Sequence, residues 1–279
     1  MTAPAGIIRE LTMLDKTTQI SQYARLAEMR YRLGMRKSFW LEFLHTGEWE
    51  LRELHKYVRR DGIALDVGAC SGVYAYHLSR MARYVYAFEP VPENAERIRR
   101  LRVKNVVVEN VALSSREGNA KLRIPLVSSR GEDKGMASLE PRVVADERLS
   151  RTIDIPLRRL DDYEFRNISF IKIDVEGHEE DVLDGGRETI IRERPCLLIE
   201  IEERHNPGGL GRIDKSLSGL GYEGFYFEHR KRRPARTFDS AGNQLPSRAF
   251  ETGNESRRSL SYINNFLYCP TARSVSNGS

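Results

Sequence analysis

The sequence predicts an α/β protein whose mostly parallel sheet is covered by helices on both faces. From residue 63 onward, short apolar segments alternate with segments of helical spacing, and turn residues separate them. Strands that alternate with helices are typical of parallel sheets, because each crossover between parallel strands needs a long connection. The 279 residues suffice for a buried core that needs no disulfide or metal to hold it together.

The chain divides into a predicted extension, one domain and a tail. Residues 1–60 are predicted to be a helical extension, since four apolar residues in Glu48–Val58 recur at helical spacing. The α/β domain is expected to span residues 61–272, and residues 273–279 to form a disordered tail.

The predicted elements of the domain follow one another in a regular order. Strands are expected at Ile63–Val67, Tyr84–Phe88, Val106–Leu113, Ser169–Val175, Cys196–Ile201, Tyr222–Phe227 and Phe266–Cys269. Helices are expected at Gly72–Met81, Pro92–Val103, His178–Arg192 and Leu210–Leu220. Two extended segments, Asn119–Leu126 and Thr152–Leu157, flank a polar loop over 127–150, and residues 229–262 are interpreted as a long insertion.

Composition indicates the compartment. No apolar stretch is long enough for a membrane span, and Glu10 precedes any long apolar run, which argues against a cleaved secretory signal. The three cysteines, Cys70, Cys196 and Cys269, are odd in number and widely spaced, which argues against a disulfide framework or a structural zinc site. We therefore predict a cytoplasmic protein. The sequence does not indicate its oligomeric state.

The basic character of the chain is confined to one segment. The net charge is +5, and residues 229–258 hold eight Lys or Arg against three Asp or Glu. The run RKRRPAR at 230–236 has three interpretations: a solvated loop, contact with an acidic acceptor or an anionic membrane surface, or contact with nucleic acid. Nucleic acid is not predicted as a partner, because the sequence contains no RNA-binding module.

The first strand ends in a Gly-containing turn, DVGACSG, from Asp66 to Gly72. A strand that enters such a turn and then a helix is how open α/β sheets bind nucleotide-like ligands. Cys70 and Ser71 interrupt the GxGxxG pattern of dinucleotide sites, and the turn fits the looser pattern of methyl-donor sites better. Glu89, at the end of the second strand, is placed to accept hydrogen bonds from a ribose diol. The alternatives are a turn without a ligand and a Glu89 that caps a helix or lies at a solvated strand end.

A wider set of motifs runs from about Gly62 to Pro207: DVGACSGVY, AFEPVPENAERI, ENVALSSREG, GMASLE, IKIDVEGHEEDVLDG and RPCLLIEIEERHNP. In this order and spacing they resemble the FkbM-type family of S-adenosylmethionine-dependent methyltransferases. The resemblance implies a Rossmann-like class I methyltransferase fold with seven strands, of which the last is antiparallel. It also implies S-adenosylmethionine as the methyl donor. Cys70 departs from the family, which commonly has Asn after DVGA, so one hydrogen-bonding side chain is missing.

The same resemblance implies which residues hold the donor. Asp66, Gly68 and Gly72 would frame its methionine part, and Glu89 its ribose. Asn110, Val111 and Ala112 would border the adenine. Ala69, Cys70 and Pro90, which lie in the same two turns, complete the predicted cofactor site, together with Asp174.

The fourth predicted strand carries polar residues where a parallel strand is normally apolar on both faces. Alternation places Lys172, Asp174 and Glu176 on one side, and a buried lysine there needs an acidic partner from Asp174 or from the fifth strand. Asp174 and Glu176 are the predicted catalytic pair, with His205 as a third catalytic candidate; the alternative is a structural ion pair.

A metal site is not predicted. Asp174, Glu176, Glu202 and His205 are near enough in the predicted topology to hold a divalent ion, but their spacing matches no metal motif. His178, which opens the next helix, is interpreted as a first-turn residue that faces solvent rather than as a base or metal ligand.

The function predicted from these features is O-methylation of a hydroxyl, on a sugar, glycan or glycosylated natural product. A small-molecule or glycan acceptor is thus the predicted partner, with the loop 127–150 and the insertion 229–262 beside it and more mobile than the sheet. Two alternatives stay open: a nicotinamide-dependent oxidoreductase, and a binding module without activity on a methyltransferase fold.

Overall fold

A computed structural model describes residues 29, 32–37, 49–127, 131–143, 147–244 and 262–271. The chain forms two compact units, residues 1–42 and 43–279, and the second contains the predicted α/β domain. In the first unit the described residues 32–37 are helical. The predicted tail at 273–279 lies outside the described residues.

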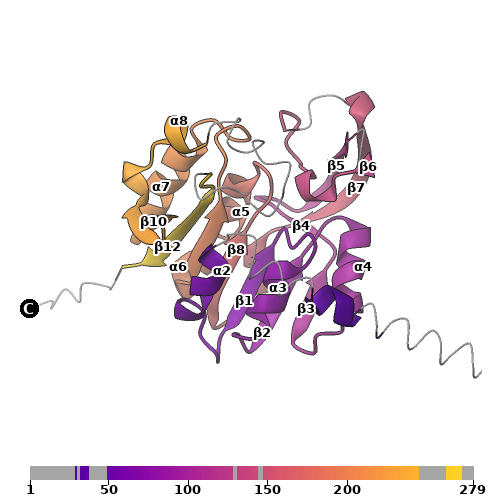
Figure 1. Ribbon diagram of the computed structural model, residues 1–279, viewed down its shortest axis with the longest axis horizontal. Helices are drawn as coiled ribbons and strands as arrows, with labels where there is room; N and C mark the ends of the chain where they lie inside the picture. The colour runs from indigo at the N-terminus through magenta and orange to yellow at the C-terminus, as the bar shows by residue number, and fades with distance from the viewer. Residues whose placement is uncertain are drawn as a thin grey trace, which may run out of the picture. The chain divides into compact units, whose positions relative to one another are not determined.

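Among the described residues of the second unit, eight strands form one sheet in the order β11-β10-β12-β9-β8-β1-β2-β3 (Figure 1). Their bounds are β1 Ile63–Val67, β2 Tyr84–Phe88, β3 Val106–Glu109, β8 Ile168–Ile173, β9 Cys196–Glu200, β10 Tyr222–Glu228, β11 Lys231–Pro234 and β12 Asn265–Pro270. Strands β1, β2, β3, β8 and β9 are parallel, and β12 runs antiparallel between β9 and β10. This confirms the predicted fold class, with one strand more than the seven expected.

The additional strand is β11, which pairs antiparallel with β10 at one edge of the sheet. It lies inside the segment 229–262 that we interpreted as an irregular insertion. The described part of that segment also contains a 3₁₀ turn, Ala235–Thr237, and the helix α8, Ser240–Asn243, whereas residues 245–261 lie outside the described ones. The basic run is thus largely a strand, and the loop interpretation was wrong.

The described residues also form a second sheet of four strands, three of which, β5, β6 and β7, lie at the upper right of Figure 1. It consists of β4 Ala112–Leu113, β5 Gly118–Val127, β6 Gly131–Glu132 and β7 Ser150–Arg158. The two extended segments predicted here are the long antiparallel pair β5 and β7. The single strand predicted over 106–113 is two strands, β3 in the main sheet and β4 in the second sheet. Between them, the side chain of Asn110 donates to the carbonyl oxygens of Glu89 and Pro90, and the chain leaves the main sheet at this point.

Helices connect the strands and pack against them. Their bounds are α2 Trp49–Glu53, α3 Val73–Leu78, α4 Pro92–Arg100, α5 Glu179–Gly185, α6 Arg187–Glu193 and α7 Gly209–Gly219. Short 3₁₀ turns lie at Leu54–Lys56, Lys134–Met136, Glu147–Leu149 and Leu160–Tyr163. The single helix expected over 178–192 is two helices. They divide at Gly186. A Cβ added at the preceding residue, Gly185, would lie 1.9 Å from the carbonyl oxygen of Ser114, so this position has no room for a side chain.

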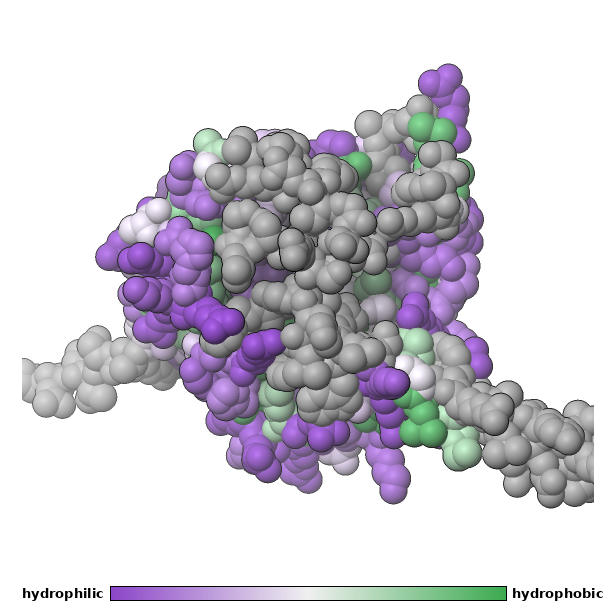
Figure 2. Space-filling model, viewed as in Figure 1, coloured by the Kyte–Doolittle hydropathy of each residue, from purple (hydrophilic) through white to green (hydrophobic). Residues whose placement is uncertain are grey.

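The core lies along the central strands. All six residues of β8 are buried, and its apolar side chains pack with those of β1 and β9. Cys196 and Cys269, on the neighbouring strands β9 and β12, are free thiols whose sulfur atoms lie 3.5 Å apart. Hydrophilic residues dominate the described part of the face shown in Figure 2. None of the described helices is long and apolar enough to cross a membrane.

Candidate active site

A pocket opens at the carboxyl ends of β1, β2 and β8, where open α/β sheets bind their ligands. It encloses about 540 Å³ of space between atoms, including solvent at its mouth. Eight of the predicted site residues line it: Gly68, Cys70, Glu89, Pro90, Val111, Ala112, Asp174 and Glu176. Five others, Asp66, Ala69, Gly72, Asn110 and His205, do not line it.

The turn after β1 depends on its glycines for close approach. Gly68 has φ of +80°, and a Cβ there would lie 1.8 Å from the carbonyl oxygen of Asp174. Gly72 has φ of +86° and begins α3 against the side chain of Ile98, 2.9 Å from where its Cβ would be. The turn therefore holds the ends of β1 and β8 together and brings α3 close to α4.

Glu89 links the turn to the second strand. Its Oε2 accepts a hydrogen bond from the amide of Cys70 at 2.7 Å, and its Oε1 accepts one from the amide of Val91 at 2.9 Å. The carboxyl is 3% exposed, and burial raises its pKa to about 7. Glu89 thus supports the start of α4, the alternative we considered for it, and it also lines the pocket. Each carboxylate oxygen has more than one lone pair, so these contacts leave capacity for a ligand.

The buried lysine of β8 has the acidic partners that alternation predicted. Lys172 Nζ lies 3.5 Å from an oxygen of Asp174 and 3.7 Å from one of Glu200 on β9. It also donates to Asn265 Oδ1 at 3.3 Å. Burial raises the pKa of the Glu200 carboxyl well above its usual range. Both predicted partners of Lys172, Asp174 and an acid of the fifth strand, therefore lie beside it.

Asp66 belongs to the same buried network. Burial raises its pKa to about 7, although the charge of Lys172 acts in the opposite direction. Its Oδ2 is buried and has no hydrogen-bond partner among the described residues. Asp66 is thus a buried residue of β1 that does not line the pocket.

Glu176 and His205 form a pair, of which only Glu176 reaches the pocket. Glu176 Oε2 lies 2.8 Å from His205 Nδ1, and burial raises the pKa of the Glu176 carboxyl. Glu176 has φ of +50°, which turns the chain sharply after β8. His205 also lies 3.8 Å from Glu202, whereas Asp174 contacts Lys172 on the other side. The four residues considered for a metal do not form a common cluster among the described residues.

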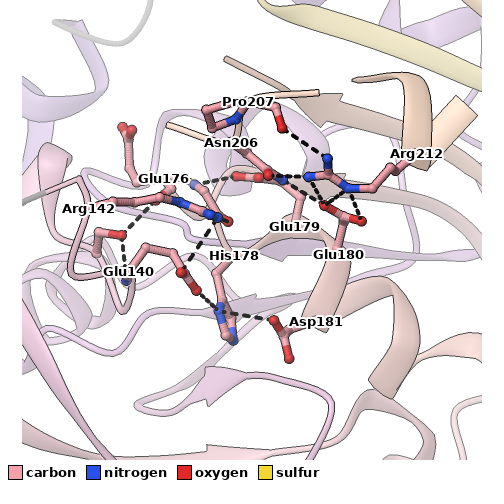
Figure 3. A network of polar contacts seen from close by, with 12 residues as sticks. Glu140, Arg142, Glu176, His178, Glu179, Glu180, Asp181, Asn206, Pro207 and Arg212 are labelled. Carbon is pink, nitrogen blue, oxygen red and sulfur yellow. Dashed lines mark hydrogen bonds and ion pairs between the residues drawn. The ribbon is translucent and has the colours of Figure 1, made fainter. Parts of the chain in front are cut away.

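His178 corrects the sequence interpretation. Its side chain is only 11% exposed and lines the pocket instead of facing solvent. Nδ1 lies 2.9 Å from Glu140 Oε1 (Figure 3). Nε2 lies 3.0 Å from Ser114 Oγ. The interpretation was wrong because it considered only the helix. Ser114 directly follows β4, and Glu140 lies in the loop after β6.

The sequence analysis also missed four lining residues from the loop 127–150. Lys134, Gly135, Ala137 and Leu139 line the pocket. Ser138 anchors this segment, since its hydroxyl donates to the carbonyl oxygen of Glu176 at 2.6 Å and accepts from the amide of Glu140 at 3.0 Å. The motif GMASLE, at 135–140, was the available signal, because it covers this segment.

Comparison with protein-family models identifies the chain. Residues 66–223 match the model described as the methyltransferase FkbM domain, which is more than half of the sequence. The chain belongs to the FkbM methyltransferase family. This confirms the predicted family and excludes the oxidoreductase alternative. A comparison with curated proteins finds no match.

Solved structures give distant matches. A methyltransferase FkbM from Methylobacillus flagellatus is 16% identical with a TM-score of 0.47, and the match covers 76% of this chain but 44% of that one. A putative methyltransferase from Streptococcus mutans in complex with SAH is 12% identical, with a TM-score of 0.44, and covers 81% of this chain and 98% of that one. An rRNA methylase from Streptococcus thermophilus is 12% identical, with a TM-score of 0.43, and the match covers 80% of this chain and 93% of that one.

Family membership confirms S-adenosylmethionine as the methyl donor, and the lining of the pocket suits it. Glu89, which follows β2, presents a carboxyl group to the pocket, which fits the hydroxyls of the donor's ribose. Apolar side chains such as Val111 and Leu122 line another part, which fits an adenine ring. The FkbM-type domain is therefore a S-adenosylmethionine-dependent methyltransferase.

Proposed function

We propose that this FkbM-type methyltransferase methylates a hydroxyl oxygen on a sugar, a glycan or a glycosylated natural product. The observation that carries the proposal is the pair Asp174 and Glu176 at the end of β8. Both line the pocket whose other residues suit the donor. The sugar class is taken from the family resemblance, and the motif DVEG at this strand end favours a hydroxyl over a nucleobase nitrogen.

The donor site we propose keeps the predicted residues with two kinds of role. Gly68, Cys70, Glu89, Pro90, Val111 and Ala112 contact the donor directly, since they line the pocket. Asp66, Ala69, Gly72 and Asn110 hold the two turns in shape. Asn110 does so through its bonds to the carbonyl oxygens of Glu89 and Pro90.

The chemistry requires alignment and removal of one proton. When bound, S-adenosylmethionine supplies a methyl group that is already activated by the sulfonium. The acceptor oxygen must lie in line with the methyl group, and such positioning can supply roughly 7–11 kcal/mol of a barrier. The oxygen also loses its proton as it gains the methyl group. Asp174, whose carboxylate is paired with Lys172, is the proposed acceptor of that proton.

Glu176 and His205 have a supporting part in this proposal. His205 Nδ1 lies 2.8 Å from one oxygen of Glu176, and the Glu176 side chain also lines the pocket. The pair would orient the acceptor hydroxyl beside Asp174. His205 is thus a positioning residue, because it does not line the pocket itself.

The test is methyl transfer from labelled S-adenosylmethionine to a panel of sugars and glycosides, with the methylated atom identified by mass spectrometry and NMR. The proposal predicts a methyl ether on a sugar hydroxyl. A product methylated on nitrogen or carbon would overturn it. Calorimetry with S-adenosylhomocysteine on the same preparation shows that the donor site is intact, so that a negative result on the whole panel counts against the sugar class.

A further inference from the structure

A second cluster of ionisable side chains lies at the edge of the pocket, outside the pair assigned to catalysis. Glu140, His178 and Asp181 point toward one another in Figure 3. One ring nitrogen of His178 and one oxygen of each acid all lie within 4.8 Å of one another. We propose that these three residues bind a divalent first-row transition-metal ion. One imidazole and two carboxylates form a donor set that suits Zn²⁺, Co²⁺ or Mn²⁺.

The strongest argument for a metal site is the pair of carboxylates that faces Nδ1 of His178. Glu140 Oε1 lies 2.9 Å from it, and Asp181 Oδ2 lies 3.6 Å from it. One nitrogen thus faces two carboxylates in a place where its side chain is only 11% exposed. Two carboxylates that meet at one imidazole nitrogen favour a cation between them. A metal ion bound to all three atoms supplies that charge.

Each ligand has a further partner that orients it. Nε2 of His178 contacts Ser114 Oγ at 3.0 Å, which leaves Nδ1 available when Nε2 carries the proton. The hydroxyl of Ser115 donates to the other oxygen of Asp181 at 2.5 Å. Arg142 lies 3.6 Å from the other oxygen of Glu140. Partners of this kind are typical of metal-binding histidines and carboxylates, whose orientation they hold.

The loop that contributes Glu140 is attached to the end of β8. Ser138 bonds to the carbonyl oxygen of Glu176, and Arg142 donates to that of Gly177 at 3.5 Å. A Cβ at Gly177 would lie 3.4 Å from Cγ of Glu140, so the loop packs closely over this turn. The three ligands are therefore brought together by the fold before any ion binds.

Three protein ligands leave coordination positions for water or for a substrate oxygen. His178 lines the pocket, so these positions lie beside the proposed acceptor. The ion would bind the acceptor through an oxygen and lower the pKa of its hydroxyl. This role rests on the proposed function, whereas the metal site itself does not.

The alternative is a protonated His178 that forms ion pairs with both acids and binds no metal. Titration with Co²⁺ distinguishes a metal site from these ion pairs, because the visible absorption of Co²⁺ changes when protein ligands bind it. The full-length protein, treated with a chelator and then freed of it, is titrated with Co²⁺ by absorption and with Zn²⁺ by calorimetry. Neither donor nor acceptor is present. We expect one ion per chain.

Variants locate the ion. His178→Ala, Glu140→Gln and Asp181→Asn are each expected to weaken binding by more than about tenfold, and Ser115→Ala by about tenfold. Asp184→Asn, an exposed acid on the same helix α5, is the matched control and should bind as the wild type does. Circular dichroism establishes that each variant is folded.

Two results would overturn the proposal. One is the absence of any Co²⁺ or Zn²⁺ binding by the wild type at millimolar concentration. The other is binding that all three ligand variants retain, which would place the ion elsewhere. If the ion binds as expected but no sugar hydroxyl is methylated, the proposed function fails and the metal site stands.

Discussion

Two groups of charged side chains meet at the end of β8, and they are built in different ways. The first, around Lys172 with Asp174 and Glu200, lies on neighbouring strands and is held by the main sheet. The second, around His178 with Glu140 and Asp181, joins the start of a helix to a loop. Strand alternation alone brings the first group together. The second depends on how a loop of the small sheet packs against the large one.

The difference indicates how a substitution in each group should affect the protein. Lys172 is 1% exposed and fixed by strands on both sides, so the loss of its charge leaves acids without compensation inside the protein. Asp181 is 45% exposed, and water can solvate it when its partners are removed. We therefore expect changes in the first group to affect folding, and changes in the second to affect binding.

The largest effect is expected for Lys172→Met. The change removes the positive charge between Asp174 and Glu200, and breaking a buried ion pair of this kind costs about 3–5 kcal/mol of unfolding free energy. Urea denaturation measures it. Lys121→Met is the matched control, because Lys121 is exposed in its ion pair with Asp154 and should lose less than about 1 kcal/mol. A loss as small as that of the control would show that the buried network is not needed for stability.

Asp174→Asn separates catalysis from structure within the first group. If Asp174 accepts the proton of the acceptor, turnover should fall about 10²-fold or more, while affinity for the donor changes little. If it only pairs with Lys172, the melting temperature should fall and turnover should change modestly. Steady-state kinetics and thermal denaturation on the same variant decide between them. Asp154→Asn, at an exposed ion pair, is the control.

Glu89→Ala tests the donor site with a smaller expected effect. The loss of a charged acceptor costs about 1.5–3 kcal/mol, so affinity for S-adenosylhomocysteine should fall at least tenfold by calorimetry. Glu89 also accepts from the amides of Cys70 and Val91, and Glu89→Gln keeps one of those acceptors. Glu96→Gln changes an exposed acid on α4 and should leave affinity unchanged. Wild-type affinity in a folded Glu89→Ala protein would remove Glu89 from the donor site.

The last test concerns pH. Burial raises the pKa of Asp66 to about 7, so between about pH 4 and pH 7 the folded protein holds a proton that the unfolded chain has released. The contribution of Asp66 to stability is thus complete below the unfolded pKa and is lost as the pH rises toward 7. Asp66→Asn should flatten the fall of unfolding free energy between about pH 4 and pH 7, and Asp61→Asn, at an exposed site, should not. An unchanged slope in Asp66→Asn would show that Asp66 titrates normally.

The parts of the molecule that follow from local pattern were predictable from the sequence. The parallel strands, the turn after β1 and the partners of Lys172 depend on periodicity and on strand order, which the sequence shows directly. The position of His178 depends on Ser114 and Glu140, which lie 64 and 38 residues away. No local pattern indicates such contacts. The division of the helix at Gly186 was missed for the same reason, since it follows from the contact of Gly185 with Ser114.

The strand β11 has a consequence for the protein in concentrated solution. Among the described strands it forms one edge of the main sheet, and the unpaired amide and carbonyl groups of an edge strand are a template for the strand of another molecule. Its sequence is Lys-Arg-Arg-Pro, its first three residues are exposed, and its last lacks an amide hydrogen. Like charges repel a second copy, and the proline interrupts a continuous ladder. The basic run that sets the net charge of the chain thereby protects this edge from aggregation.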